Sequence, residues 1–454
     1  MDWTGRILEL RIDAVGHGGV FVARSEGRVV LVRRALPGER VRARVTEDKG
    51  GSFCRAEATD VLEAAPDRVA DACPAALAGA GCCDFSHIAP DAQRRLKQEV
   101  LAEQLARIAH LPRQVPVTPL PVAAPGMHPV AAPGMHPVAA PGMHPGAGGT
   151  GAGDPGAAAG WRSRIRLSVD DAGRAGYRRY RGSEVVADLR CPQQIPGALE
   201  GLQDTVWRAG AELAVAVDDD GRRHVVEIAP PPLTRAAHRR AGRRGASARR
   251  AARSQRRAEH IVEGGGSAVQ RVDGREWRLA PTGFWQVHTA AAQAYSDLVG
   301  AWSGLRGGDT AWDLYGGAGV FAAAMAAHVG DAGRVEVVES SAQSVRDGRD
   351  ALADLDAVRF HHTRVGHALE EFAGAGRAPD AVVLDPPRAG AGREVIGALS
   401  ATAVARVVHV GCDPASFARD LGLYGEAGFR VEELAAFDGF PMTHHFESFA
   451  LLVR

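Results

Sequence analysis

A cysteine near the C-terminus, Cys412, stands in a context that suits a nucleophile. It comes just after the apolar run 406–410, and an acid, Glu447, comes just before the apolar run 449–453. Short apolar runs of this kind predict strands. Because functional groups of an α/β sheet gather at one edge, the thiol and the carboxylate are expected close together. A lone cysteine otherwise packs as a small hydrophobic residue, which is the alternative.

A thiolate beside a carboxylate suits the methylation of a carbon that is not itself nucleophilic. Addition of a thiolate to C6 of uracil makes C5 enolate-like, so that C5 accepts a methyl group. A base must then remove the C5 proton before the cysteine can leave. Cys412 and Glu447 are candidates for these two roles.

A glycine-rich turn upstream predicts the site of the methyl donor. Residues 313–319 read Asp-Leu-Tyr-Gly-Gly-Ala-Gly and lead into an apolar stretch at 320–329. Glycines in such a turn let a ligand approach the backbone. Glu339, after the next strand, is placed to accept hydrogen bonds from ribose hydroxyls. A turn of this kind usually indicates a dinucleotide, but this pattern fits a nucleoside without pyrophosphate better, namely S-adenosyl-L-methionine.

A second turn, Asp385-Pro386-Pro387-Arg388, ends the apolar run 381–384. Its two prolines make the loop rigid and hold Asp385 at the sheet edge. Methyltransferases that act on exocyclic base amines carry an aromatic residue after the Pro-Pro pair. Arg388 therefore argues against that chemistry, and a plain strand-ending turn is the alternative.

The elements that must position these residues are indicated by the pattern of apolar runs. From about Pro281, short strands alternate with helical lengths, which predicts an α/β fold with a mostly parallel, doubly wound sheet for 279–454. Residues 1–63 carry short, glycine-punctuated strands typical of an OB-like β-barrel. Arginines on its polar faces suit nucleic acid, and a purely structural barrel is the alternative.

The segment between these two domains is heterogeneous. Residues 64–118 are assigned to the start of a central domain plus an amphipathic helix at 91–110 that could pack on the C-terminal domain. Residues 119–160 contain a Pro-Val-Ala-Ala-Pro-Gly-Met-His repeat and predict a linker. Residues 161–278 are β-rich and mix aromatic with cationic residues, as RNA-binding surfaces do. They include an arginine run without acids at 235–257, either a phosphate-gathering segment or a solvated insertion.

Composition limits the class of protein. The chain has 454 residues, a net charge of zero and six cysteines, too few for a disulfide scaffold of this size. No window approaches the roughly 20 apolar residues of a membrane span, and the N-terminus has no signal-peptide pattern. A cytoplasmic protein without membrane contact is expected, a monomer without an obligate protein partner.

Together these motifs resemble the RNA 5-methyluridine (uracil-C5) methyltransferases, in the TRAM-domain-containing bacterial branch that acts on 23S rRNA. The motifs that carry the resemblance are Phe284-Trp285-Gln286-Val287-His288, Asp313 to Gly319, Val338-Glu339, Asp385 to Gly390, Gly411-Cys412-Asp413-Pro414 with Arg419-Asp420, and Phe440 to Glu447. The resemblance implies a class I (Rossmann-like) methyltransferase domain behind an N-terminal TRAM barrel and a β-rich central domain. It implies methyl transfer to C5 of a uridine in structured RNA, with 23S rRNA favoured by the barrel and tRNA as the other option.

The resemblance also assigns roles to individual residues. Cys412 would be the nucleophile and Glu447 the base. The methyl donor would be bound by Gln286, Tyr315, Gly317, Gly319, Glu339 and Asp385, and the RNA by Phe284, Gln286, Asp385 and Arg388. His288 and Asp413 stand where the family has asparagine. An anion at 413 would raise the pKa of the neighbouring thiol unless its side chain points away.

Members of this branch also carry a 4Fe-4S cluster on four cysteines. The candidates here are Cys73, Cys82, Cys83 and Cys191. The usual Cys-x2-Cys element is lost and two cysteines are adjacent, an awkward arrangement for one cubane. Two possibilities stay open, a cluster and a set of buried thiols left after its loss, and the altered spacing favours the second.

Two other classes of function are considered. A 5-methylcytosine RNA methyltransferase uses the same covalent logic but carries a Pro-Cys where this chain has Asp385-Pro386-Pro387-Arg388. An RNA-binding protein with a degenerate catalytic domain would keep the barrel and the arginines but lose the thiol or the base. Both groups are present here.

Overall fold

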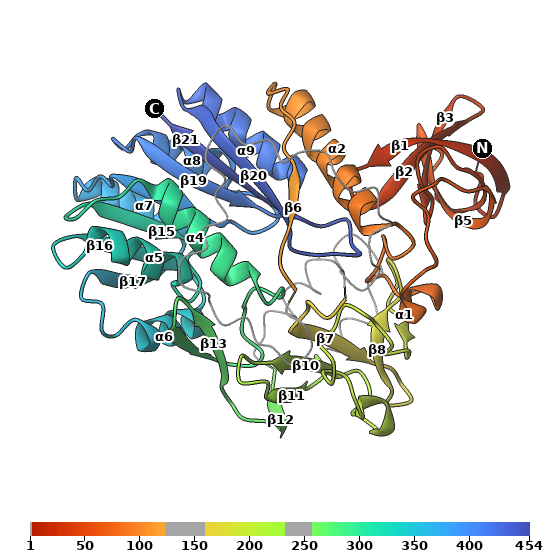
Figure 1. Ribbon diagram of the computed structural model, residues 1–454, viewed down its shortest axis with the longest axis horizontal. Coiled ribbons are helices and arrows are strands. Elements are labelled where there is room, and N and C mark those ends of the chain that lie inside the picture. The colour runs from red at the N-terminus through yellow and green to blue at the C-terminus, as the bar shows by residue number, and fades with distance from the viewer. Residues whose placement is uncertain (1, 123–158, 232–256) are drawn as a thin grey trace, which may run out of the picture.

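The computed structural model describes residues 2–122, 159–231 and 257–454 (Figure 1). Most of the predicted linker at 119–160 and of the arginine run at 235–257 lies outside these residues. Within them, none of the helices combines the length and the apolar character that crossing a membrane requires.

The first five strands form a closed barrel in the order β1-β2-β3-β5-β4. The strands are β1 (Ile7–Gly16), β2 (Val20–Ser25), β3 (Arg28–Arg33), β4 (Arg40–Asp48) and β5 (Phe53–Glu63). Side chains of β1 and β4 alternate between buried and exposed, as expected for strands with one face in a core. The barrel predicted for residues 1–63 is thus confirmed.

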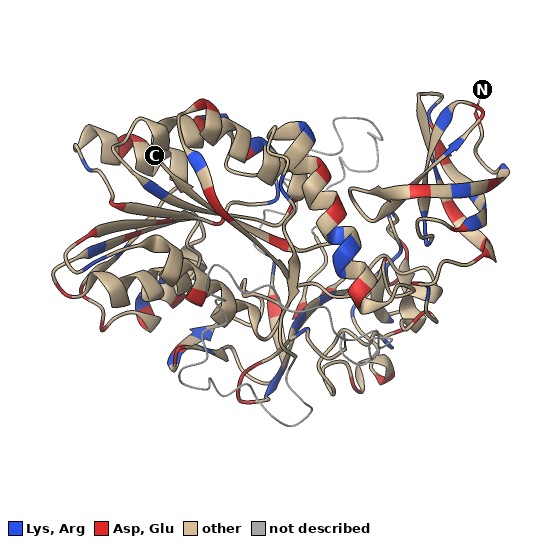
Figure 2. Ribbon diagram, turned by 45° about the horizontal axis from the view of Figure 1, so that its top comes forward, with Lys and Arg blue, Asp and Glu red and all other residues tan. Residues whose placement is uncertain are grey.

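Arginines and acids are interleaved along the strands of the barrel (Figure 2), and many of them are exposed. Arg40 contacts Glu63 at 2.9 Å and Glu9 at 3.6 Å, and Arg42 contacts Glu9 at 3.3 Å. These exposed pairs reduce the positive field of β4, because Arg40 and Arg42 each have a carboxylate within contact distance. The outer face carries mixed charge.

The central domain is built on a six-stranded antiparallel sheet in the order β12-β11-β10-β7-β8-β9. Its strands are β7 (Arg164–Val169), β8 (Ala175–Arg178), β9 (Val185–Val186), β10 (Glu212–Val217), β11 (Arg223–Ile228) and β12 (Glu259–Glu263), with the 3-10 turn η2 (Leu202–Asp204) between β9 and β10. The short helix α1 (Pro74–Leu77) packs against one face of this sheet through Ala75 and Ala76.

The C-terminal domain has an eight-stranded sheet in the order β17-β16-β15-β18-β19-β21-β20-β6. Its strands are β15 (Thr310–Leu314), β16 (Arg334–Glu339), β17 (Val358–His362), β18 (Ala381–Leu384), β19 (Arg406–Gly411), β20 (Arg430–Asp438), β21 (Glu447–Val453) and β6 (Val117–Pro119). β15 to β19 are parallel, and β21 runs antiparallel to both of its neighbours. The predicted mostly parallel α/β sheet is confirmed.

Helices cover both faces of this sheet (Figure 1). One apolar core lies between the sheet and the helices α7 (Val365–Gly374), α8 (Gly392–Ser400) and α9 (Pro414–Glu426). The core on the other face involves α4 (Ala291–Ser303) and α5 (Val320–Val329), while α6 (Ala342–Ala351) packs near the sheet edge against β16 and β17. The result is a three-layer α/β/α sandwich.

Two pieces assigned by sequence to the middle of the chain lie in the C-terminal domain. β6 pairs with β20 at the sheet edge. The hairpin of β13 (Ala268–Val272) and β14 (Arg275–Leu279) buries Val272, Trp277 and Leu279 in the same core as α4 and α5. The domain boundaries predicted at 118 and 278 differ from this arrangement. The sequence of neither segment indicates which sheet or helix the segment packs against.

Helix α2 (Pro90–Ile108) is shared between two cores. Leu96 and Val100 pack with the barrel, whereas Leu101 and Leu105 pack with α9 and the C-terminal sheet. Between these contacts the buried ammonium group of Lys97 lies 2.6 Å from Asp438 Oδ1 at the end of β20. Helix α2 therefore ties the barrel to the C-terminal domain.

Candidate active site

The residues singled out by the sequence converge on one cavity of about 1660 Å³ at the carboxyl ends of the parallel strands. Its lining includes Phe284, Gln286, Tyr315, Gly317, Glu339, Asp385, Arg388, Cys412 and Glu447. In doubly wound sheets ligands bind at this edge. The residues selected by their spacing in the sequence therefore lie together in one cavity.

Cys412 and Glu447 are brought together by strand register. β19 and β21 pair with Gly411 opposite Ser448, so Cys412 and Glu447 occupy the next opposed positions. Burial and then the Glu447 carboxylate raise the pKa of Cys412 to about 12, an effect that the Arg388 guanidinium opposes. Opposite charge favours ionisation of a thiol and like charge disfavours it. The thiol and the carboxyl group are thus electrostatically linked.

Glu447 is a buried acid with unused hydrogen-bonding capacity. Its side chain is 6 % exposed, and Oε2 has no hydrogen-bond partner among the described residues. Burial, reinforced by Asp385, raises the pKa of Glu447 well above its ordinary value. Burial also raises the pKa of Asp385 to about 7. Raised carboxyl pKa values of this kind suit proton transfer near neutral pH.

The glycine-rich turn forms a cradle with Glu339. Glu339 Oε2 accepts a hydrogen bond from the Gly317 backbone N–H at 3.1 Å, and Oε1 accepts one from Ser341 at 2.5 Å. Gly317 has φ 56° and open space where a Cβ would stand, so a ligand can approach its backbone. This donor and acceptor set fits the adenosine part of S-adenosyl-L-methionine.

Gly319 plays a different part from Gly317. A Cβ at Gly319 would come within 2.8 Å of Phe360 and 2.9 Å of Leu352. Its φ of 77° also favours glycine at the start of α5. The missing side chain of Gly319 thus serves close packing beneath the loop, and its predicted role at the cofactor stays a prediction.

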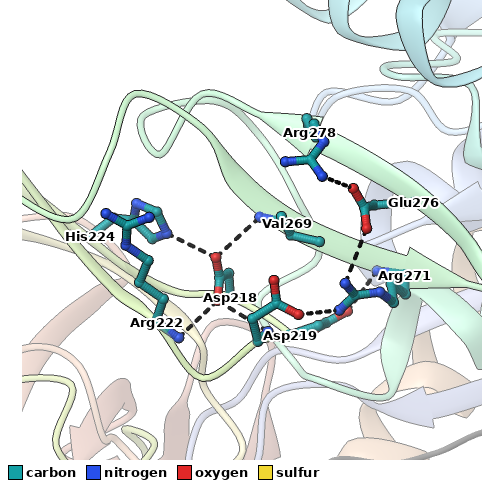
Figure 3. Close-up of polar contacts among 9 residues, drawn as sticks. Asp218, Asp219, Arg222, His224, Val269, Arg271, Glu276 and Arg278 are labelled. Atoms are coloured by element: carbon teal, nitrogen blue, oxygen red, sulfur yellow. Dashed lines mark hydrogen bonds and ion pairs between the residues drawn. The ribbon is translucent and has the colours of Figure 1, made fainter.

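The loop is supported from below by the β13–β14 hairpin. Trp277 Nε1 donates a hydrogen bond to the carbonyl of Ala318 at 2.9 Å. The hairpin is in turn fixed to the central sheet through the β10–β11 turn (Figure 3). There Asp218 accepts hydrogen bonds from His224 Nε2 at 2.9 Å and from the Val269 backbone at 3.3 Å. Because Asp218 and His224 are buried, this junction is rigid.

The segment that carries Phe284 and Gln286 is held by hydrogen bonds from two arginine side chains of strand β7. Arg164 Nη1 donates to the Gly283 carbonyl at 3.1 Å, and Arg166 Nη2 donates to the Thr282 carbonyl at 3.0 Å. The Phe284 ring is left 71 % exposed at the rim of the cavity. An exposed aromatic ring beside such a cavity suits stacking on a base.

The two residues that replace family asparagines have partners other than the thiol. Asp413 caps α9 by accepting hydrogen bonds from Ser416 N and Oγ, both at 2.9 Å. His288 is buried and stacks on Trp161 with 5.6 Å between ring centroids. Burial lowers the pKa of His288 to about 4, so this imidazole is a neutral packing group.

Two site residues were given no role by the sequence analysis, although His445 belongs to the quoted motif Phe440 to Glu447. His445 lines the cavity and places Nε2 3.4 Å from Arg388 Nη2. His17, in the barrel turn between β1 and β2, lies 3.0 Å from Asp413 Oδ2. No local pattern links a barrel histidine to a residue near the other end of the chain.

The four candidate ligand cysteines meet in space. The sulfur atoms of Cys73, Cys82, Cys83 and Cys191 all lie within 4.8 Å of one another. Cys83 Sγ and Cys191 Sγ are 3.5 Å apart. Hydrogen bonding with Cys191 and then with Cys73 raises the pKa of Cys83, whereas the pKa of Cys191 is lowered by its thiol neighbours. Despite the altered sequence spacing, the thiols fit a tetrathiolate site for a metal centre.

Comparison with known proteins finds a family match for the N-terminal part of the chain and another for the C-terminal part. Residues 306–454 match the family model for tRNA (uracil-5-)-methyltransferase, and residues 3–58 match that for the TRAM domain. An uncharacterised RNA methyltransferase of Streptomyces avermitilis is 39 % identical over 455 residues, covering 99 % of this chain and 98 % of the relative. A similar protein of Corynebacterium glutamicum is 36 % identical over 460 residues, covering 99 % and 97 %.

Two further matches carry more specific names. The 23S rRNA (uracil(1939)-C(5))-methyltransferase of Alkalilimnicola ehrlichii is 30 % identical over 467 residues, covering 98 % of this chain and 96 % of the relative. The Pyrococcus abyssi tRNA (uracil-54, C5)-methyltransferase, solved with S-adenosyl-L-homocysteine, shares the fold with a TM-score of 0.67, at 20 % identity and with coverage of 98 % and 99 %. The predicted class I methyltransferase domain with an N-terminal TRAM barrel is confirmed. The chain therefore belongs to the S-adenosyl-L-methionine-dependent RNA (uracil-5-)-methyltransferases, in the group whose members begin with a TRAM domain.

Proposed function

We propose that this enzyme methylates C5 of a uridine in 23S rRNA through a covalent bond between Cys412 and C6 of the base. The observation that carries the proposal is the placement of Cys412 and Glu447 at the end of the β19–β21 ladder, inside the cavity that also holds the Gly317–Glu339 cradle. The named relative that acts on 23S rRNA matches nearly the full length of the chain and supports that RNA over tRNA.

The covalent sequence assigns one bond change to each group. The Cys412 thiolate forms the S–C6 bond, and the electron pair of the C5–C6 double bond moves to C5. C5 takes the methyl group, which S-adenosyl-L-methionine supplies when bound. The Glu447 carboxylate then takes the C5 proton, the double bond re-forms and the S–C6 bond breaks. Its raised pKa makes Glu447 a stronger base than a solvated carboxylate.

The surrounding residues orient the two ligands. Glu339 and the backbone at Gly317 would hold the nucleoside of the donor, with Tyr315 beside them. Gln286 and Asp385 would face the uracil edge and the donor, and Phe284 would stack on a neighbouring base. Arg388 lowers the pKa of Cys412 and so favours the thiolate.

Two experiments test this function. Nucleoside mass spectrometry of 23S rRNA from cells with and without the gene should show loss of a 5-methyluridine, and unchanged 5-methyluridine in every RNA would contradict the proposal. With 5-fluorouridine RNA the wild-type enzyme should form a covalent adduct, because fluorine at C5 blocks the final proton removal. The adduct should be absent in Cys412→Ala, and its persistence would exclude this nucleophile.

We also propose that Cys73, Cys82, Cys83 and Cys191 hold a metal centre as thiolates. The convergence of the four sulfur atoms supports this proposal. The metal centre would have a structural role. Met442 lies in the same core cluster as these cysteines, in the loop that leads to Glu447. About four iron atoms and about four acid-labile sulfides per chain in anaerobically purified protein would identify a 4Fe-4S cluster, and zinc alone a single ion. Absence of both metals would contradict the site.

A further inference from the structure

We propose that the TRAM barrel positions the nucleophile, and that His17 does so by holding the Asp413 carboxylate away from Cys412. This inference rests on the proposed role of Cys412. It adds a positioning function to a barrel whose expected role is contact with RNA, and it gives a reason for an acid directly beside the nucleophile.

The first step is the geometry of Asp413. Both of its oxygens are engaged by groups other than the thiol, and Asp413 is not among the groups that shift the pKa of Cys412. Oδ1 accepts from the backbone N–H and the hydroxyl of Ser416 at 2.9 Å each, and Oδ2 lies 3.0 Å from Nε2 of His17. Burial alone would raise the pKa of Asp413, but the contacts with His17 and Ser416 keep it below its ordinary range. The carboxylate is thus an anion with a fixed direction.

The second step is the placement of His17. It stands in the turn that joins β1 to β2, between Gly16 and Gly18. Gly19 of the same turn has φ 74°, and a Cβ there would come within 2.7 Å of Asp84 Oδ2 and 2.8 Å of His444 Nδ1. The turn is therefore pressed against the Asp84–His444 ion pair. Little room is left for it to shift.

The third step is what the turn touches. Asp413 is the residue after the nucleophile, and His444 lies in the loop just before Glu447. One barrel turn thus contacts the segments that carry both proposed catalytic groups. The same turn, with Cys412, Arg388 and His445, lines a small cavity of about 90 Å³ beside the main site. The barrel turn therefore lines a cavity that also reaches Cys412.

The consequence concerns the ionisation of the thiol. The groups that already act on Cys412 are Glu447 and Asp385, which raise its pKa, and Arg388, which lowers it. If His17 is lost, one oxygen of Asp413 is free to turn, and a third carboxylate near the sulfur disfavours the thiolate further. The expected result is a shift of Cys412 reactivity towards higher pH by about one pH unit.

The experiment is the pH–rate profile of Cys412 alkylation by iodoacetamide in full-length protein, read by mass spectrometry of the peptide that contains Cys412. His17→Ala should shift the profile to higher pH. His17→Gln, which keeps an N–H donor near the position of Nε2, should restore the wild-type profile. In an Asp413→Asn background, loss of His17 should cause no shift. Arg44→Ala, an exposed change on the same barrel, is the matched control.

A His17→Ala profile that overlays the wild type, or a shift that persists with Asn at 413, would overturn the proposal. If His17→Ala shows no cooperative melting transition, His17→Asn replaces it, since the shorter amide does not reach Asp413. Failure of the proposed function would appear separately, as the absence of a 5-fluorouridine adduct in wild-type enzyme.

Discussion

Asp385 and Glu447 bring two carboxyl groups to one thiol, and the Asp385 carboxylate raises the pKa of Glu447 on top of the effect of burial. Asp385 follows β18, and Glu447 begins β21. These two strands lie on either side of β19, and Cys412 directly follows β19. Two acids at such a site do not both ionise easily, so the protonation of one depends on the other.

Neutralising Asp385 should therefore change the pH dependence of the reaction. In Asp385→Asn the pKa of Glu447 falls, and because Glu447 acts as a base only when ionised, the acid limb of single-turnover release of methylated RNA should move to lower pH. The rate itself should drop, since Asp385 lines the donor site. Glu339→Gln, in the same cavity, should slow the reaction without moving the limb. An unmoved limb in Asp385→Asn would argue against the coupling.

Replacing the base should separate methyl transfer from product release. Glu447→Gln should reduce turnover by about 10²- to 10⁴-fold, the range for loss of general base catalysis. Because the C5 proton stays in place, a covalent complex with unmodified substrate RNA should accumulate and be visible on a denaturing gel. Glu433→Gln, exposed on β20, is the control. Free RNA alone in the Glu447→Gln reaction would assign proton removal to another group.

Arg388 should control the reactivity of the thiol. Its guanidinium lowers the pKa of Cys412, so Arg388→Met should raise that pKa and slow peptide-mapped alkylation of Cys412 at pH 8 to 9. Arg388→Lys keeps the charge and should retain most of the rate. The exposed Arg393→Met tests for a general effect of lost arginine. Equal alkylation of Arg388→Met and wild type would contradict this role.

The buried Lys97–Asp438 pair should matter for stability. Lys97→Met leaves Asp438 as an unpaired buried charge, which costs about 3–5 kcal/mol in the free energy of unfolding. The double variant Lys97→Met/Asp438→Asn should recover part of that loss. Urea unfolding followed by tryptophan fluorescence measures both. Lys49→Met, on the exposed barrel surface, should change stability by no more than about 0.5 kcal/mol. A similar effect of Lys49→Met and Lys97→Met would refute the importance of the pair.

Much of the site was predictable because its residues carry local signals. Cys412 and Asp385 each follow an apolar strand and Glu339 ends one, and the carboxyl ends of parallel strands lie at one edge of the sheet. Gly319 has the same signal as Gly317, yet its missing side chain serves packing against Phe360. A glycine in a sequence motif indicates a position where a side chain is not tolerated. It does not indicate whether a ligand or a neighbouring side chain occupies that space.

The rest depends on contacts between distant segments. His17 and Asp413 are separated by 396 positions, and Cys83 and Cys191 by 108. Spacing along the sequence restricts only the positions of ligands that are close together in the chain. The altered spacing of the cysteines therefore suggested that the metal site was lost, although the four thiols converge in the structure. Strands β17 and β20 were not predicted because each is partly exposed and carries charged residues that interrupt an apolar run.

The sharing of helix α2 between two cores has a consequence for target choice. A helix of 19 residues is about 28 Å long, and its two halves are embedded in the barrel and in the C-terminal domain. The helix therefore fixes the barrel relative to the domain that carries Cys412. An RNA that contacts both the barrel and the cavity would have to fit that fixed spacing, which constrains the shape of the substrate.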